Sequence, residues 1–209
     1  MNNSFYGLTT WLYAIALIFE FLCAHGQFNR FQWKNIKNNN LSYPTLWFFT
    51  QITHLNAFLS FLYFYLAPST VLATEWETSL SDNTLIPPTS VLLFRTIVPL
   101  TIVVDIMYTC LYFSNYNFSF PTLWMHALNL IPLWYEWFTF HHGEYGGQCF
   151  DNDDVFGFYR PLLLVPIYII LFFAYYMYTG EWSYTVLNLR TMIGWISLCG
   201  FVGMLFVVG

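Results

Sequence analysis

The chain has 209 residues, a formal net charge of −5 and only six lysine and arginine residues. Hydrophobic residues make up 57% of it and charged residues 8%, whereas soluble domains carry roughly 25% charged residues. So few charges cannot build a water-facing surface, and the sparse basic residues form no patch for nucleic acid. The composition therefore predicts an integral membrane protein without a nucleic-acid partner, and the length predicts a single domain over residues 1–209.

Six apolar segments are long enough to cross a bilayer, which takes about 20 residues in a helix. In chain order they cover residues 8–24, 45–66, 90–113, 119–142, 161–179 and 189–208. Because a backbone in hydrocarbon must satisfy its own hydrogen bonds, we predict an all-α fold, a polytopic membrane bundle of six transmembrane helices. Both an endomembrane such as the endoplasmic reticulum and the mitochondrial inner membrane stay open as the location.

Small residues in the last segment predict that it packs closely against another helix. Gly194, Gly200 and Gly203 lack side chains that would hold a neighbouring helix away.

Polar residues share one face of the fourth segment. His126, Asn129 and Glu136 fall within about 80° of arc when the chain turns by about 100° per residue. An imidazole, an amide and a carboxyl are expensive to bury in hydrocarbon, so such groups normally face a bundle interior or a wet cavity. We therefore expect this face to point inward.

Three further ionisable residues lie inside apolar segments. Glu20, Arg95 and Asp105 must each be paired, neutral or near water, and none should lie alone against acyl chains. We expect Arg95 and Asp105 to find partners on other helices, because about two and a half helical turns separate them.

The second segment contributes a candidate nucleophile. Thr50 and His54 lie on one helical face at a spacing of four residues. A threonine hydroxyl needs a base within hydrogen-bond reach, and a neutral buried imidazole such as that of His126 suits this task. Two simpler interpretations stay open: a threonine hydroxyl bonded to a carbonyl one turn back, and a histidine that is an ordinary core residue.

The histidine pattern argues against a metal centre. Only five histidines exist, and none recurs at the H-x3-H spacing of metal-dependent hydroxylases. The adjacent pair His141 and His142 would point in different directions on a helix. We expect neither a metal nor another cofactor.

Short motifs in the second and fourth segments, taken together, resemble the androgen-induced-gene family of multi-pass membrane threonine hydrolases. The step 48–50, Phe-Phe-Thr, stands where that family has an aromatic-leucine-threonine step with its catalytic threonine. The family's catalytic histidine precedes a glutamate by ten residues, followed by a threonine and a histidine pair. The matching residues here are His126, Glu136, Thr139, His141 and His142.

A third motif and several departures complete the comparison. The family's Gly-x-Trp-x-Tyr step before its last span matches Gly180, Trp182 and Tyr184. The family also has six spans, so the resemblance covers nearly the whole chain. The chain departs from the family in lacking a basic C-terminal tail, in Gln51 after the threonine and in the additional His54.

The resemblance implies a lipid esterase that cleaves fatty acid esters of hydroxy fatty acids. Thr50 would attack the ester carbonyl, and His126 would take its proton and return it to the leaving alkoxide. From their place on the helical faces, Asn129 would orient the imidazole or donate to the oxyanion, and Glu136 and His54 would support the pair. Membrane lipids and an acyl-ester substrate entering from the bilayer are the expected partners.

A second interpretation belongs to a different class of protein. A small bundle that is 23% aromatic has much surface with which it could pack on neighbouring proteins. The chain would then be a non-catalytic accessory subunit of a large membrane complex, for example a mitochondrial one, that retains the hydrolase-like fold. A hydrolase requires the Thr50 and His126 side chains to be within about 3.5 Å, or one water apart.

Overall fold

The computed structural model describes residues 3–25, 43–67, 89–112, 123–138, 160–184 and 187–208. Across these ranges the chain forms helices and no strand, which confirms the predicted all-α class. The elements are α1 (Asn3–Ala24), α2 (Pro44–Phe49), α3 (Ile52–Leu66), α5 (Thr89–Tyr112), the π-helical segment η2 (Trp124–Leu128), α7 (Leu130–Glu136), α10 (Arg160–Thr179) and α11 (Met192–Val208).

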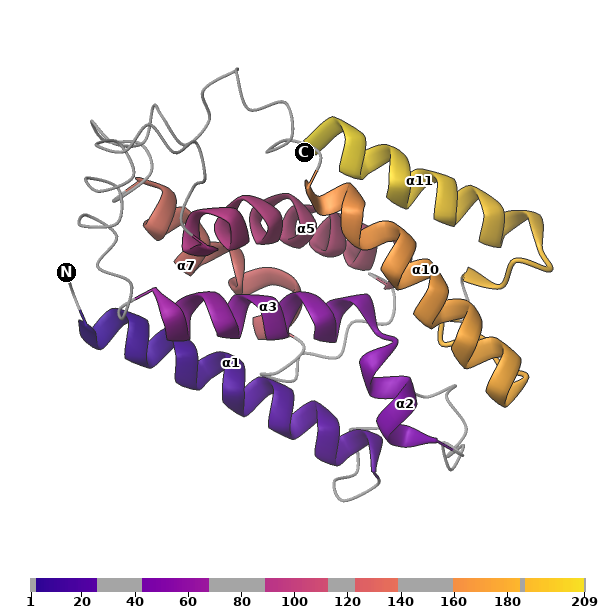
Figure 1. The fold of residues 1–209 in the computed structure, drawn as a ribbon, viewed down its shortest axis with the longest axis horizontal. Helices are drawn as coiled ribbons and strands as arrows, with labels where there is room; N and C mark the ends of the chain where they lie inside the picture. The colour runs from indigo at the N-terminus through magenta and orange to yellow at the C-terminus, as the bar shows by residue number, and fades with distance from the viewer. Residues whose placement is uncertain are drawn as a thin grey trace.

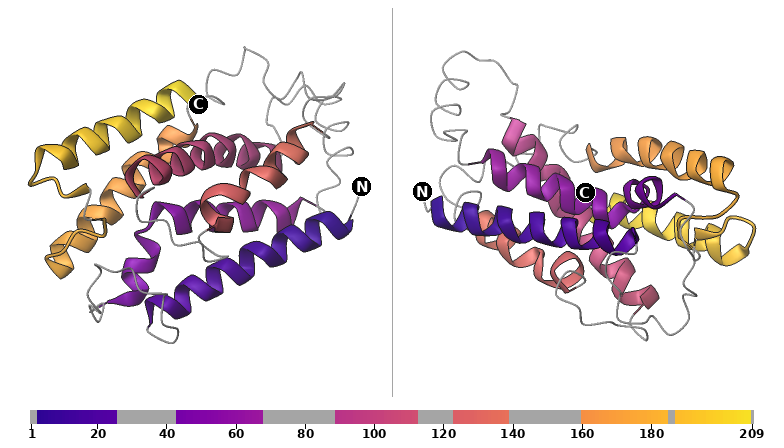
Figure 2. Two further views of the ribbon diagram at one scale, coloured as in Figure 1. Left: turned by 180° about the vertical axis from the view of Figure 1, so that it is seen from behind. Right: turned by 90° about the horizontal axis from the view of Figure 1, so that it is seen from below.

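Three long helices form the centre of the molecule. Helix α1 packs on α3 and α3 packs on α5, while η2 contacts all three of them (Figure 1). Helices α10 and α11 pack on α5, so that α1 and α11 lie at opposite edges of the assembly (Figure 2). The main apolar core is built from α1, α3, α5, η2 and α7, and its fully buried members include Tyr13, Phe64, Phe94 and Leu133.

The predicted single helix over residues 45–66 is interrupted, which corrects that prediction. Helix α2 ends at Phe49 and α3 begins at Ile52, because Gln51 is extended, with a φ of −85° and a ψ of 118°. Side chains compensate for the interruption. The Thr50 hydroxyl donates to the carbonyl of Trp47 at 2.8 Å, and Nδ1 of His54 bonds the carbonyl of Phe48 at 2.9 Å. The break therefore leaves these two buried carbonyls satisfied.

The fourth apolar segment is also not a uniform α-helix. It begins with the π-helical turn η2, and α7 follows after a turn at Asn129. Pro132 has no amide hydrogen to donate to the carbonyl of Leu128, so a regular α-helical hydrogen bond cannot form there. The side-chain amide of Asn129 donates instead to the carbonyl of Met125 at 2.9 Å. Such π-helical turns occur frequently at functional sites.

Two helices in the described ranges have the length and hydropathy needed to cross a membrane. They are the stretches Ser4–Ala24 in α1 and Leu93–Cys110 in α5. Shorter apolar helices cover Ile52–Leu66, Leu164–Thr179 and Met192–Leu205. Buried core helices of soluble proteins and N-terminal signal sequences can meet the same two criteria, so these helices alone do not define a membrane topology.

Two of the three glycines of α11 do not lie in close contact with another helix, which differs from the prediction. A Cβ atom added to Gly200 or Gly203 would have nothing within 4 Å. A Cβ atom added to Gly194 would lie 2.1 Å from the carbonyl oxygen of Asn188. The close approach is thus between the first turn of α11 and the connection that precedes it.

We expect Gly194→Ala to destabilise the protein, because a Cβ atom at that distance forces the backbone at Asn188 to move. Gly200→Ala is the matched control. It adds the same methyl group in open space and replaces glycine by the best helix former, a gain of up to about 1 kcal/mol. Thermal unfolding of both variants in detergent measures the difference, and equal midpoints would contradict the close approach.

Candidate functional site

The candidate nucleophile lies at the break between α2 and α3. Thr50 is 1% exposed, and its hydroxyl proton is donated to the carbonyl of Trp47. The next residue, Gln51, donates from Nε2 to the backbone carbonyl of Ser183 at 3.1 Å. Thr50 is therefore held in the interior, and the break beside it is attached to the turn that follows α10.

That turn carries the third motif of the sequence resemblance. Gly180 has a φ of +74°, a conformation that glycine adopts without steric penalty, and its N–H bonds the carbonyl of Tyr176 at 2.8 Å to end α10. The Trp182 ring then stacks on the Tyr176 ring, with centroids 4.1 Å apart and planes inclined by 12°. The motif thus forms the turn whose Ser183 carbonyl accepts the hydrogen bond from Gln51.

The candidate base lies in the π-helical turn. The His126 imidazole stacks on the Tyr108 ring of α5, with centroids 3.5 Å apart and planes inclined by 12°. Its side chain is buried, and Nδ1 has no hydrogen-bond partner among the described residues. Stacking therefore fixes the plane of the ring while one ring nitrogen is left unengaged.

The additional histidine has a different environment. Nδ1 of His54 bonds the carbonyl of Phe48, and Nε2 lies 3.9 Å from the Glu20 carboxylate. The two imidazoles, His54 and His126, lie within electrostatic range of each other. Both nitrogens of His54 already face partners, so its main effect is to hold the helix break against α1.

Thr50 and His126 are not joined by a hydrogen bond, since the Thr50 hydroxyl bonds Trp47 and Nδ1 of His126 has no partner in the described part of the chain. The proposed transfer of a proton between them requires the Thr50 side chain to turn. Direct contact of the two groups stays a prediction.

The Asn129 amide group bonds both α5 and the π-helical turn. Its Nδ2 donates to Oδ1 of Asp105 at 3.4 Å and to the carbonyl of Met125 at 2.9 Å. Both amide hydrogens are therefore used, so that Asn129 has none left to donate to an oxyanion in this conformation. A role of Asn129 in orienting the His126 ring stays a prediction.

Glu136 is held by two tyrosines that the sequence analysis did not single out. The Tyr6 hydroxyl lies 2.8 Å from both carboxyl oxygens, and the Tyr63 hydroxyl lies 2.6 Å from Oε1. All three side chains are essentially inaccessible to solvent. Because they come from α1, α3 and α7, this cluster fastens three elements together at the end of α3 away from Thr50.

The predicted inward face of the fourth segment is confirmed, because His126, Asn129 and Glu136 are all buried. The side chains of Glu20, Arg95 and Asp105 are buried as well, as expected for ionisable groups in apolar segments. Asp105 has its predicted partner on another element in Asn129. A further interior pair, Asn56 of α3 and Thr101 of α5, exchanges hydrogen bonds of 3.0 and 3.2 Å.

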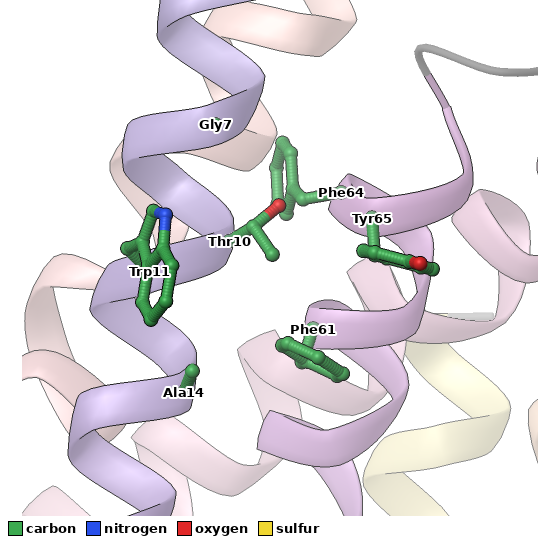
Figure 3. Close-up of a pocket in the computed structure, with 7 residues that line it drawn as sticks. All are labelled: Gly7, Thr10, Trp11, Ala14, Phe61, Phe64 and Tyr65. Atoms are coloured by element: carbon green, nitrogen blue, oxygen red, sulfur yellow. The ribbon is translucent and has the colours of Figure 1, made fainter.

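A shallow apolar groove of about 430 Å³ runs between α1 and α3 (Figure 3). It is lined by Gly7, Thr10, Trp11, Ala14, Phe61, Phe64 and Tyr65. The lining residues of α3 come from its C-terminal end, whereas Thr50 precedes its N-terminus. This groove is therefore not the place where an ester would meet Thr50.

The described residues contain no group of three or more histidine, cysteine, aspartate or glutamate side chains that could hold a metal ion. His141, His142 and Thr139, which form part of the sequence resemblance, lie outside the described residues. Comparison with protein-family models, curated proteins and solved structures finds no match to this chain.

Proposed function

We propose that the chain is embedded in a membrane and crosses it six times, with α2–α3 and η2–α7 each acting as one span. The distribution of side chains supports this proposal. Large apolar side chains face outward, among them Trp11 (68% exposed), Met177 (79%) and Val207 (85%). Such apolar surface is unfavourable in water and suited to lipid.

Charged side chains show the opposite distribution. Glu20, Arg95, Asp105 and Glu136 are buried, whereas Glu181 and Arg190 are exposed in the connection between α10 and α11. Ionisable groups in the interior and in a connection, combined with apolar groups on the helix surfaces, are typical of membrane bundles. The separation supports the bilayer as the environment of the helices.

We infer further that this bundle is a lipid ester hydrolase in which Thr50 is the nucleophile and His126 the general base. One observation carries the assignment of the base: His126 has a buried, unengaged ring nitrogen, whereas both nitrogens of nearby His54 face partners. A general base needs a nitrogen free to accept a proton. The substrate class, acyl esters such as fatty acid esters of hydroxy fatty acids, comes from the sequence resemblance.

The chemistry divides into two steps. The Thr50 hydroxyl leaves the Trp47 carbonyl and attacks the ester carbonyl carbon while His126 accepts its proton. The tetrahedral adduct then breaks the ester C–O bond, and His126 returns the proton to the leaving alkoxide. In the second step water attacks the acyl carbon while His126 accepts its proton. The bond between the acyl carbon and the Thr50 oxygen then breaks, the acid leaves, and His126 returns the proton to the Thr50 oxygen. In this proposal the first-turn amides of α3, which begins two residues after Thr50, stabilise the oxyanion.

Thr50→Ala is expected to reduce ester hydrolysis at least about a hundredfold, since the nucleophile is lost. Thr50→Ser should retain part of the activity. The matched control is Thr53→Ala, which removes another buried threonine of the same segment. Initial rates of the purified protein in detergent, with a fatty acid ester of a hydroxy fatty acid as substrate, give the comparison. Undiminished activity of Thr50→Ala would exclude it as the nucleophile.

One observation favours the alternative, a non-catalytic subunit of a membrane complex. In this conformation the Thr50 hydroxyl has the ordinary structural role of bonding a carbonyl three residues earlier. Outward apolar side chains on α10 and α11, such as Ile170 and Ile193, would then contact partner subunits. Inactive wild-type protein that co-purifies with a defined membrane complex would establish this alternative.

A further inference from the structure

Two buried oxygen atoms between α5 and the end of η2 have no hydrogen-bond partner. They are Oδ2 of Asp105 and Oδ1 of Asn129, and the missing partner refers to the described part of the chain. The two residues are 7% and 1% exposed. The two side chains are already in contact through their other atoms, since Nδ2 of Asn129 donates to Oδ1 of Asp105 at 3.4 Å. Buried polar atoms are rarely left unpaired, so this pair of oxygens requires an explanation.

The orientation of the Asn129 amide is fixed by its second bond. Nδ2 also donates to the carbonyl of Met125 at 2.9 Å. If the amide were flipped, its oxygen would face the carbonyl oxygen, and two acceptors repel each other. Oδ1 of Asn129 is therefore an acceptor beside the Asp105 carboxyl. An ionised carboxylate has no hydrogen to offer it, whereas a carboxylic acid has one.

No basic side chain among the described residues forms an ion pair with the Asp105 carboxylate, whose side-chain partner is the Asn129 amide. The neighbouring polar group from α1 is the Tyr13 hydroxyl, which donates to the backbone carbonyl of Asn129 at 3.3 Å and lies within electrostatic range of Asp105. One helical turn further along α5, the Tyr108 ring stacks on the His126 ring of η2. A buried carboxyl without a cationic partner must hold a proton or a cation.

We propose that Asp105 carries a proton on Oδ2 and donates it to Oδ1 of Asn129, which closes an acid–amide pair that positions the π-helical turn bearing His126. One proton satisfies both unpaired oxygens at once. The catalytic consequence rests on the proposed function, whereas the protonated pair itself does not.

The register between α5 and η2 connects this pair to the candidate base. Asp105 and Tyr108 are three residues apart on α5, and Asn129 and His126 are three residues apart on the facing segment. Asp105 contacts Asn129 through the 3.4 Å hydrogen bond, and the Tyr108 ring stacks on the His126 ring with centroids 3.5 Å apart. The two segments therefore pair in antiparallel order. Asp105 is therefore a positioning residue, since it holds the turn whose stacking orients the His126 ring.

Infrared spectroscopy of the purified protein at neutral pH tests the proton. The wild type should show the C=O stretching band of a buried protonated carboxyl, and Asp105→Asn should lose it. Because Glu136 is also buried, Glu136→Gln serves as the reference that separates the two carboxyls. Spectra of wild type and Asp105→Asn that do not differ in this region would overturn the proposal. Stabilisation of the wild type by sodium, but not by choline, without the band would show that a cation occupies the place of the proton.

Nuclear magnetic resonance of protein with labelled histidine tests the positioning. The Tyr108 ring current should give His126 a distinctive shift, which His126→Gln identifies by its loss. Asp105→Asn can form two amide–amide hydrogen bonds and should keep the shift, whereas Asp105→Leu should change it and lower kcat at least about tenfold. A shift lost in Asp105→Asn, or kept in Asp105→Leu, would contradict the proposal. The infrared band and the His126 shift can be measured in a protein that hydrolyses no ester. The proposal of a protonated Asp105 and the proposal of an esterase can therefore be refuted independently of each other.

Discussion

Replacing His126 with glutamine is expected to lower ester hydrolysis by about two to four orders of magnitude, the usual contribution of a general base. Among the histidines that the structure describes, the substitution removes the imidazole whose Nδ1 is buried and unengaged. Glutamine has a similar length and can remain against the Tyr108 ring, so the fold should survive. Initial rates at saturating and at low substrate concentration should show that kcat falls while KM changes little.

The same substitution at His54 separates the two histidines. A glutamine there can still donate to the carbonyl of Phe48, while the contact with Glu20 is weakened. We expect a modest loss of stability and a much smaller loss of rate than for His126→Gln. His25→Gln, at a part-buried histidine that bonds Phe21 and Thr45, is the control for histidine replacement in general. A greater loss of rate in His54→Gln than in His126→Gln would reverse the assignment of the base.

Glu136→Leu is expected to destabilise the bundle by about 2 to 6 kcal/mol. The carboxyl accepts the hydroxyls of Tyr6 and Tyr63, and leucine would remove this acceptor from both buried donors. Removing the acceptor of a buried donor costs about 1 to 3 kcal/mol, and the two losses together give the sum. Unfolding in mixed micelles, followed by circular dichroism, measures the change.

Two further variants identify the origin of that loss. Glu136→Gln retains an acceptor oxygen at nearly the same place and should lose much less stability than the leucine variant. The triple change Glu136→Leu, Tyr6→Phe and Tyr63→Phe also removes the two hydroxyls that lost this acceptor, and it should recover part of the loss. Glu181→Leu, at an exposed glutamate, should have little effect. A triple variant less stable than Glu136→Leu alone would show that the hydroxyls have other acceptors.

Spacing along the sequence was sufficient to predict the all-α class and the inward face of the fourth segment. Helical periodicity places His126, Asn129 and Glu136 on one side whatever surrounds them, and desolvation then decides that this side is buried. The same reasoning correctly placed Glu20 and Asp105 in the interior. These features depend on local geometry and on the cost of burying polar groups.

The partners of those residues could not be predicted, because they depend on contacts between distant segments. The helix break at Gln51 contains neither proline nor glycine, and it is attached through Ser183, which is 132 residues away. In a chain with 16 tyrosines, no local signal distinguishes Tyr6 and Tyr63 as the two that hold Glu136. Asn129 was assigned to its neighbour His126, whereas its side chain reaches across to Asp105.

The buried contacts of residues 123–138 have a consequence for biosynthesis. Five side chains from other described helices that hold this segment precede it in the chain: Tyr6, Tyr13, Tyr63, Asp105 and Tyr108. Synthesis proceeds from the N-terminus, so these groups are already made when Asn129 and Glu136 emerge from the ribosome. Residues 123–138 can thus dock on these groups as soon as they are made, whereas α10 and α11, which are made last, pack against α5.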